Sequence, residues 1–307
     1  MERISTSTAY NGVLTNLMNA ENQQATISSQ ISSEQNATDL KGYASQAETL
    51  TALQSVQAQV TGYLSNSQNT AAQLSTQDTA LTQVGAAANS ASQAITTALA
   101  AGNGDTLMQS LQNAFQNAVQ GLNTTYNGNY VFAGGNSSTA PVTASTLSDL
   151  TAASPLSSIF TNGQHIATTQ ITSSTSVQTG QLASTLGTPL FTALQAIVAN
   201  GPYSGPLTQA QQSSLETQLA AVNAAGTGLT TATAQNGQSQ AEVASAQTAL
   251  TSQQTSLTGL IGNITNVNLA QASSNLSQAQ LAVQASSRVF EALQSSSLMA
   301  VLTASGH

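Results

Sequence analysis

The chain has 307 residues, which is long enough for two or three domains and a substantial core. Charged residues make up 5% of it, against about a quarter of an ordinary soluble protein, and the net charge is −8. Its three basic residues, Arg3, Lys41 and Arg288, cannot form a phosphate-binding face, which excludes binding to nucleic acid or to an anionic membrane surface. No apolar run approaches the roughly 20 residues that span a bilayer, and no cleavable secretory signal is visible at the N-terminus.

Gln, Ser, Thr and Asn replace charged residues on the expected surface. Such a surface hydrogen-bonds to neighbouring copies with little desolvation of charge, so it suits a protein buried on many sides in an assembly. A general low-charge habit of the source explains the composition equally well. The hydrophobic content of 40% argues against disorder, and the absence of Cys fits both a cytoplasmic protein and an exported one without disulfides.

Apolar residues at helical spacing predict three helices in the N-terminal part. Residues 1–32 read as a weak amphipathic helix, and residues 33–41 as a connector with capping side chains. A long helix then runs over residues 42–101, and Asp105 caps a further helix that continues to Leu122. Two heptad series mark the long helix: Leu53, Val60, Leu74, Leu81, Ala88 and Ile95, broken only by Ser67, and beside it Leu50, Leu64, Ala71 and Leu99.

The pattern changes after Tyr126. Asn127-Gly128, the apolar stretch from Tyr130 to Phe132 and Gly134-Gly135 predict a turn, a short strand and a second turn. Residues 140–185 are rich in Ser, Thr, Val and Ile without a helical period, which predicts a small β module. The remaining elements are a short helix from Pro189, a break over residues 201–206, and helices over residues 208–229, 234–261 and 268–303.

The C-terminal helices also carry heptad series, so both chain ends present narrow apolar stripes. A helix with such a stripe cannot bury it alone, so we expect the N-terminal and C-terminal helices to pack together. The predicted fold class is therefore mainly α: a long antiparallel helical bundle or coiled coil formed by both chain ends, with a small inserted β module. We call eight of the heptad residues the assembly seam: Leu53, Val60, Leu74, Leu81, Leu269, Leu276, Val283 and Phe290.

This layout predicts three parts. Residues 1–40 and 263–307 are terminal assembly helices, expected to be disordered in the monomer because their apolar stripes are narrow. Residues 41–139 and 186–262 form a helical core domain, and residues 140–185 form a β-rich outer module.

No group of side chains suggests catalysis. His165 and His307 lack partners at metal-ligand or triad spacing, and the acidic residues are scattered singly. Asp78, inside the long helix, is better explained as a register or partner contact than as a catalytic acid. We therefore expect no enzyme activity, no cofactor and no metal site.

Four segments resemble bacterial flagellin-family proteins: RIST near the N-terminus, SEQNATDLKGY in the connector, NGNYVFAGG after the predicted helix that ends at Leu122, and LAVQASSRVFEAL near the C-terminus. The residues that carry the family-like motif are Arg3, Asn127, Gly128, Tyr130, Phe132 and Gly134. The connector departs from the family pattern because it lacks the usual basic run and Pro. The resemblance covers both ends and the long helices and fades across residues 140–185.

The resemblance implies a self-assembling structural component of the flagellum, which is exported to the cell exterior through the flagellar type III channel without cleavage. It implies a homo-oligomeric ring or helical assembly, with a hook-associated protein, flagellin and an export chaperone as partners. The NGNYVFAGG block is most similar to hook-associated members, which favours a role in joining hook to filament. The alternatives are a filament flagellin, an unrelated secreted coiled-coil binding protein, and an enzyme with an unrecognised site.

Overall fold

The computed structural model describes residues 2–304. Its contacts divide the chain into two compact units, each described by itself: a terminal unit, Met1–Ala58 with Gln254–His307, and a central unit, Gln59–Gln253. Two long helices, α2 (Ala47–Ala101) and α6 (Gln209–Thr265), contribute to both units. The three-part division expected from the sequence stays a prediction.

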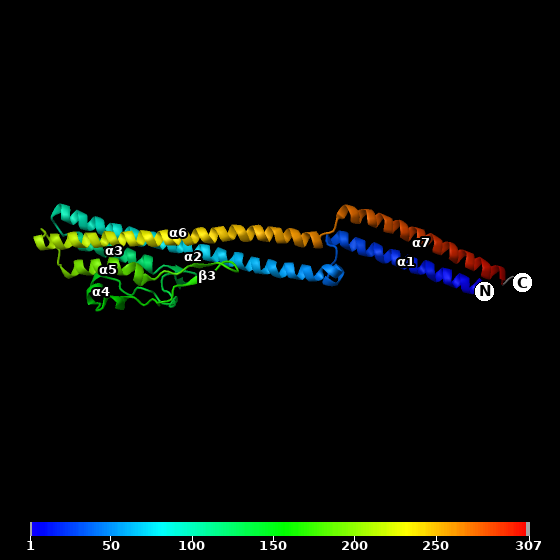
Figure 1. Cartoon of the computed structure of the whole chain (residues 1–307), viewed down its shortest axis with the longest axis horizontal. Helices are drawn as coiled ribbons and strands as arrows, with labels where there is room; N and C mark the ends of the chain where they lie inside the picture. Colours follow the sequence, from blue (N-terminus) through cyan, green and yellow to red (C-terminus); the bar gives the residue numbers. More distant parts are fainter. Residues whose placement is uncertain (1, 305–307) are drawn as a thin grey trace. The chain divides into compact units, whose positions relative to one another are not determined.

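The terminal unit is built on a helical pair. Helix α1 (Glu2–Ser33) and helix α7 (Leu269–Ala304) lie side by side (Figure 1). A 3₁₀ turn, η1 (Leu40–Gln46), follows α1 and leads into α2. Asp39 caps this turn, because its carboxylate accepts a hydrogen bond of 2.9 Å from the backbone N–H of Gly42. The capping chemistry predicted for the connector is therefore confirmed.

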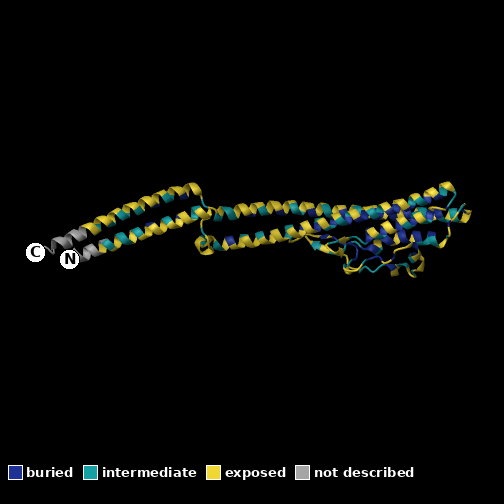
Figure 2. Cartoon of the chain, turned by 180° about the vertical axis from the view of Figure 1, so that it is seen from behind, coloured by how far each residue is buried: buried dark blue, intermediate teal, exposed yellow. Residues whose placement is uncertain are grey.

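The main apolar core lies in the central unit, where buried residues are concentrated (Figure 2). Helices α3 (Leu107–Leu122) and α5 (Ala183–Ala199) contribute to it together with α2 and α6. The ring of Phe191 stands edge-on to Phe115 at 5.0 Å and stacks on Phe160 at 5.8 Å. The short helix α4 (Leu147–Ala152) and the 3₁₀ turn η2 (Leu156–Ile159) cover one side of this core.

Heptad repeats account for the burial along both long helices. On α2 the series predicted from the sequence is buried from Val60 to Ile95, including the polar Ser67. On α6 a second series is buried at every seventh position: Leu215, Val222, Leu229, Asn236, Val243, Leu250 and Leu257. Each helix therefore directs one stripe inward, as a 3.5-residue hydrophobic period requires.

The β structure consists of two small antiparallel hairpins. Strands β1 (Thr125–Tyr126) and β2 (Asn129–Tyr130) are joined by Asn127 and Gly128, whose φ values of 50° and 80° give the hairpin turn predicted from the Asn-Gly pair. Strands β3 (Thr168–Gln170) and β4 (Ser176–Gln178) form the second hairpin. The predicted mainly α fold with a small β module is confirmed.

Several expected boundaries are wrong for physical reasons. Asp105 does not cap α3: the N-cap residue is Thr106, and the Asp105 carboxylate instead accepts a 2.6 Å hydrogen bond from the N–H of Gly205. Helix α5 begins at Ala183 rather than at Pro189, because its first turns carry apolar side chains that are buried in the core.

Two further elements differ in length from the prediction. Helix α6 runs unbroken through residues 230–233, where the sequence predicted a gap, because Leu229 and Ala232 are buried and hold this Thr-rich stretch helical. The predicted strand over Tyr130–Phe132 stops at Tyr130, since Phe132 turns into the core.

Candidate assembly surfaces

The helical pair of the terminal unit has a narrow internal contact. Among the described side chains of α1 and α7, only Ala20, Ile27, Ala272 and Ala279 are buried, at heptad spacing on each helix. Three of these four side chains are Ala, so the pair buries little apolar area. Near the far end of the pair, Tyr10 and Phe290 bring their ring centroids to 4.9 Å.

The connector anchors this pair at its other end. Val267 donates its N–H to the carbonyl of Glu34 at 3.0 Å, and Asn36 donates its N–H to the carbonyl of Thr265 at 2.7 Å. The side-chain amide of Asn36 also donates to the carbonyls of Ile264 and Asn266, at 2.8 and 3.1 Å. Asn36 is therefore the residue that fixes the turn after α1 to the turn before α7.

Large apolar side chains remain exposed on the same pair. Met18 is 54% exposed, Leu269 45%, Leu281 64% and Val289 50%. Leu281, Ala285 and Val289 follow one another at intervals of four residues, so they lie along one side of α7, and we call them the outer stripe. An exposed apolar stripe on a helix whose opposite side buries mainly Ala is typical of an interaction surface.

The assembly seam divides between the two units. Leu74 and Leu81 are fully buried inside the central unit, and Val60 is also buried. In the terminal unit Leu53, Leu276, Val283 and Phe290 are half-buried, and Leu269 is exposed. The central members therefore hold the fold of one chain, whereas the C-terminal members keep apolar area that another chain could cover.

The β3–β4 hairpin is fixed to the long helices of the central unit. Ile171 and Val177 form a small apolar cluster with Leu74 of α2 and Val243 of α6. Side chains of the two helices donate to the backbone carbonyls of the hairpin and the segment after it: Asn66 to Gln170 at 2.7 Å, Ser67 to Ile171 at 3.3 Å, Gln77 to Thr179 at 2.7 Å and Ser239 to Gln178 at 3.1 Å. Sequence reasoning missed this role of the polar side chains; the break in the heptad series at Ser67 was the available signal.

On the helix surfaces, hydrogen bonds between amide and hydroxyl side chains stand at positions where ion pairs are common in other proteins. Gln109 bonds Asn113, and Gln271 bonds Asn275, each at the i,i+4 spacing where Glu and Lys commonly pair. Many Ser and Thr hydroxyls donate to the carbonyl four residues earlier in their own helix, as Thr96 does to Ser92 at 2.9 Å. The surface is thus polar but nearly uncharged.

The family-like motif forms part of the core of the central unit. Phe132 is fully buried, and its carbonyl accepts a 3.0 Å hydrogen bond from the N–H of Ala183. Gly134 has φ +59°, and a Cβ there would stand 2.7 Å from the carbonyl oxygen of Gly163. Both conditions require glycine. The motif is therefore a folding element; the Arg3 side chain lies outside the described residues.

Within the described residues, no set of three His, Asp or Glu side chains could hold a metal ion. Among the helices of residues 2–304, none combines the length and apolar character needed to cross a membrane.

Asp149 accepts hydrogen bonds from the backbone N–H groups of Ser145 and Thr146, at 2.7 and 2.8 Å, which lower the pKa of its carboxyl below the ordinary 3.8.

Comparison with known proteins agrees with this architecture. Two solved structures share the fold: a protein described as a flagellar hook-associated protein from Vibrio parahaemolyticus, with a TM-score of 0.58, 15% identity and coverage of 71% of this chain and 96% of that one, and FlgL from Bacillus cereus, with a TM-score of 0.53, 16% identity and coverage of 70% and 99%. No curated protein sequence matches the chain.

Family models give the assignment. Residues 4–137 match the bacterial flagellin N-terminal helical region, and residues 219–302 match the bacterial flagellin C-terminal helical region. The two matched segments include the helical pair of the terminal unit and most of both long helices. The chain therefore belongs to the bacterial flagellin family and is a structural protein of the flagellum.

Proposed function

We propose that this protein joins the flagellar hook to the filament by self-assembly. The observation that carries the proposal is the exposed apolar area of the terminal unit, led by the outer stripe on a nearly uncharged surface. Two solved structures of the same fold support the junction role, since one is described as a hook-associated protein and the alignments span 96% and 99% of those chains. Filament flagellin is the alternative.

The proposed assembly is a ring or short helical array of copies, with a hook-associated protein on one side and flagellin on the other. Immunogold labelling of intact flagella tests it. A single band of label at the hook tip is the expected result. Label along the whole filament would assign the chain to the filament instead. Deletion of the gene should leave hooks in place while filament subunits are lost to the medium, because the surface on which they add is missing.

We also propose that the terminal helices serve export. Residues 2–20 of α1 bury only Ala20 among their described side chains, so they contribute little to the fold. A chain that lacks these residues should keep the melting temperature of its central unit but stay inside the cell. Normal secretion of the deletion variant would contradict recognition through this segment. An export chaperone that covers the outer stripe before assembly is the partner expected inside the cell.

A further inference from the structure

Five Asn-Gly pairs lie in the central unit, and this dipeptide is chemically reactive. The backbone nitrogen of the Gly can attack the side-chain carbonyl carbon of the Asn, because the Gly has no Cβ to shield that nitrogen. The attack needs an Asn side chain that is free to turn and a Gly N–H that is not held in a hydrogen bond. The pairs are Asn103-Gly104, Asn127-Gly128, Asn162-Gly163, Asn200-Gly201 and Asn236-Gly237.

Hydrogen bonds hold both residues in three of these pairs. The Gly N–H groups donate to backbone carbonyls: Gly104 to Gly205 at 2.9 Å, Gly163 to Ala133 at 2.9 Å and Gly201 to Val198 at 3.1 Å. The Asn side chains are engaged as well: Asn103 accepts from the N–H of Asp105 at 2.8 Å, Asn162 donates to the hydroxyl of Ser184 at 3.1 Å and Asn200 donates to the carbonyl of Ala196 at 2.8 Å. Neither condition for attack is met in these three pairs.

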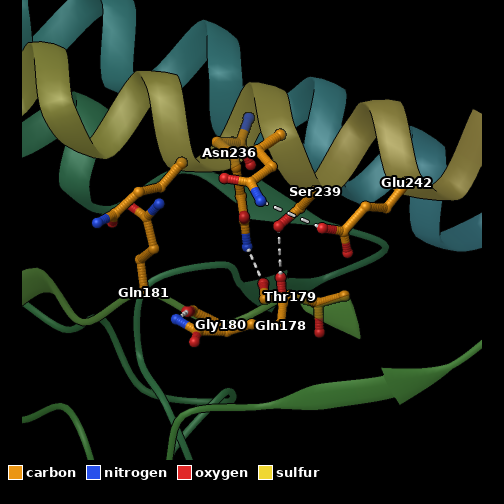
Figure 3. Close-up of a pocket in the computed structure, with 10 residues that line it drawn as sticks. Gln178, Thr179, Gly180, Gln181, Asn236, Ser239 and Glu242 are labelled. Carbon is orange, nitrogen blue, oxygen red and sulfur yellow. Dashed lines mark hydrogen bonds between the residues drawn. The ribbon is translucent and has the colours of Figure 1, made fainter. Parts of the chain in front are cut away.

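The pair at Asn236 is held by a helix. Asn236 and Gly237 lie within α6, where the helical hydrogen bonds engage the backbone (Figure 3). The Asn236 side chain is buried, and its amide donates to the carbonyl of Leu74 at 2.9 Å. This side chain therefore cannot turn toward the backbone nitrogen of Gly237.

The remaining pair, Asn127-Gly128, meets both conditions. The two residues form the turn between β1 and β2, and both are exposed. Neither the Asn127 side chain nor the Gly128 N–H makes a hydrogen bond to any part of residues 2–304. A Cβ at Gly128 would meet nothing within 4 Å, so the space around its backbone is open. The two strands have two residues each, so the turn can open at low cost.

We infer that Asn127 is a site of spontaneous deamidation. The Gly128 nitrogen gives its proton to hydroxide and attacks Cγ of Asn127. The bond from Cγ to the side-chain nitrogen breaks, and that nitrogen leaves as ammonia with a proton from water. The product is a five-membered succinimide ring. Water then opens the ring at either carbonyl, which leaves aspartate or isoaspartate at this position.

The two products have different effects on the hairpin. Asp-Gly suits the same turn as Asn-Gly, so aspartate keeps the hairpin and adds one negative charge. Residues 59–253 contain no Lys or Arg, so the central unit offers this charge no partner of opposite sign. Isoaspartate adds one atom to the main chain, which shifts Tyr126 against its partner Asn129. Old copies of the protein therefore carry a more negative central unit than new ones.

Peptide mapping by mass spectrometry tests the inference on full-length protein that is incubated at neutral and at mildly alkaline pH. Attack in the other four pairs must first break at least two hydrogen bonds, so Asn127 should convert on the order of tenfold faster than each of them. The rate should rise with pH, because the attacking nitrogen must lose its proton. Asn11-Gly12 of α1 lies in the terminal unit and reports only the opening of that helix.

Two controls separate the chemistry from the fold. Asn127→Gly keeps a dipeptide that suits the turn and removes the amide, so this peptide should stay unchanged while the other four pairs behave as in the wild type. In urea all five pairs should convert at similar rates, because the fold no longer protects four of them. The inference is overturned if any of these four converts as fast as Asn127 in the folded protein. It is also overturned if Asn127 stays intact there while the denatured protein converts.

Discussion

Replacement of Leu281 by Gln should impair assembly while it leaves the fold of the single chain nearly unchanged. Leu281 belongs to the outer stripe, and 64% of its surface is exposed. Gln has a helix propensity close to that of Leu, and neighbouring exposed positions of α7 already carry it, so the change removes apolar area without charge and without a helix penalty.

The size of both free-energy changes follows from the exposed fraction of the Leu281 side chain. Full burial of a Leu side chain is worth about 1.5–3 kcal/mol. The single chain buries roughly a third of this side chain when α7 is folded on α1, so the substitution should cost the monomer at most about 0.5–1 kcal/mol of unfolding free energy. The remaining ~1–2 kcal/mol is available to a neighbouring copy, which corresponds to about a 5- to 30-fold loss in affinity at each subunit contact. Because the same contact repeats between all subunits, this loss of affinity at every contact should prevent assembly.

Thermal unfolding of the purified variant and motility of cells that carry it measure the two effects. We expect a melting temperature within about 3 °C of the wild type together with non-motile cells. Ala282→Gln is the matched control, because it places the same side chain at the next exposed position outside the outer stripe and should leave both properties unchanged. Motile Leu281→Gln cells would refute the assembly role of the outer stripe, and a large fall in melting temperature would place Leu281 in the core.

Three other outcomes are expected. Gly134→Ala should destabilise the central unit by at least about 1–2 kcal/mol in denaturant titrations, since the left-handed backbone and the carbonyl of Gly163 both oppose a Cβ; an unchanged midpoint would refute this. Asp149→Asn should lower the melting temperature at pH 7. The difference from the wild type should shrink as the pH falls below 3.8, through the lowered pKa of the folded carboxyl, and a pH-independent difference would exclude that carboxylate as the cause. Limited proteolysis of the monomer should trim residues 1–32 and 268–307 first, and resistant ends would show that the helical pair is stable alone.

Heptad spacing made the long helices predictable. The Val60–Ile95 series sets one buried face of α2, and the same period in Leu250 and Leu257 marks the end of α6. Such repeats are local in the sequence and strong, so they predict helices without knowledge of their partners. The Asn127-Gly128 turn was predictable for a similar reason, because its backbone geometry selects those residue types.

The remaining features depend on tertiary contacts. No local pattern shows that Ala183 donates to Phe132 and so starts α5 before Pro189. The Thr-rich stretch of α6 has weak helix propensity, and burial of Leu229 overrides it. The buried position of Asn236 could have been predicted, because the heptad series of α6 counted back from Leu250 reaches it. Its hydrogen bond could not, because its side-chain amide donates to the carbonyl of Leu74 on α2.

The small cluster beneath the β3–β4 hairpin has a consequence for the time course of synthesis. Leu74 packs against Ile171 and Val177 of the hairpin and Val243 of α6, so its apolar partners lie far downstream in the chain. At about 5–20 residues per second, a ribosome needs on the order of 10 s to deliver Val243 after Leu74. Throughout that interval Leu74 lacks part of its apolar cover, whereas the α2 residues from Ala80 to Ala98 can already pack against α3. The Leu74 segment of the nascent chain is therefore the part of α2 that stays open longest to a protein that would keep it from aggregating.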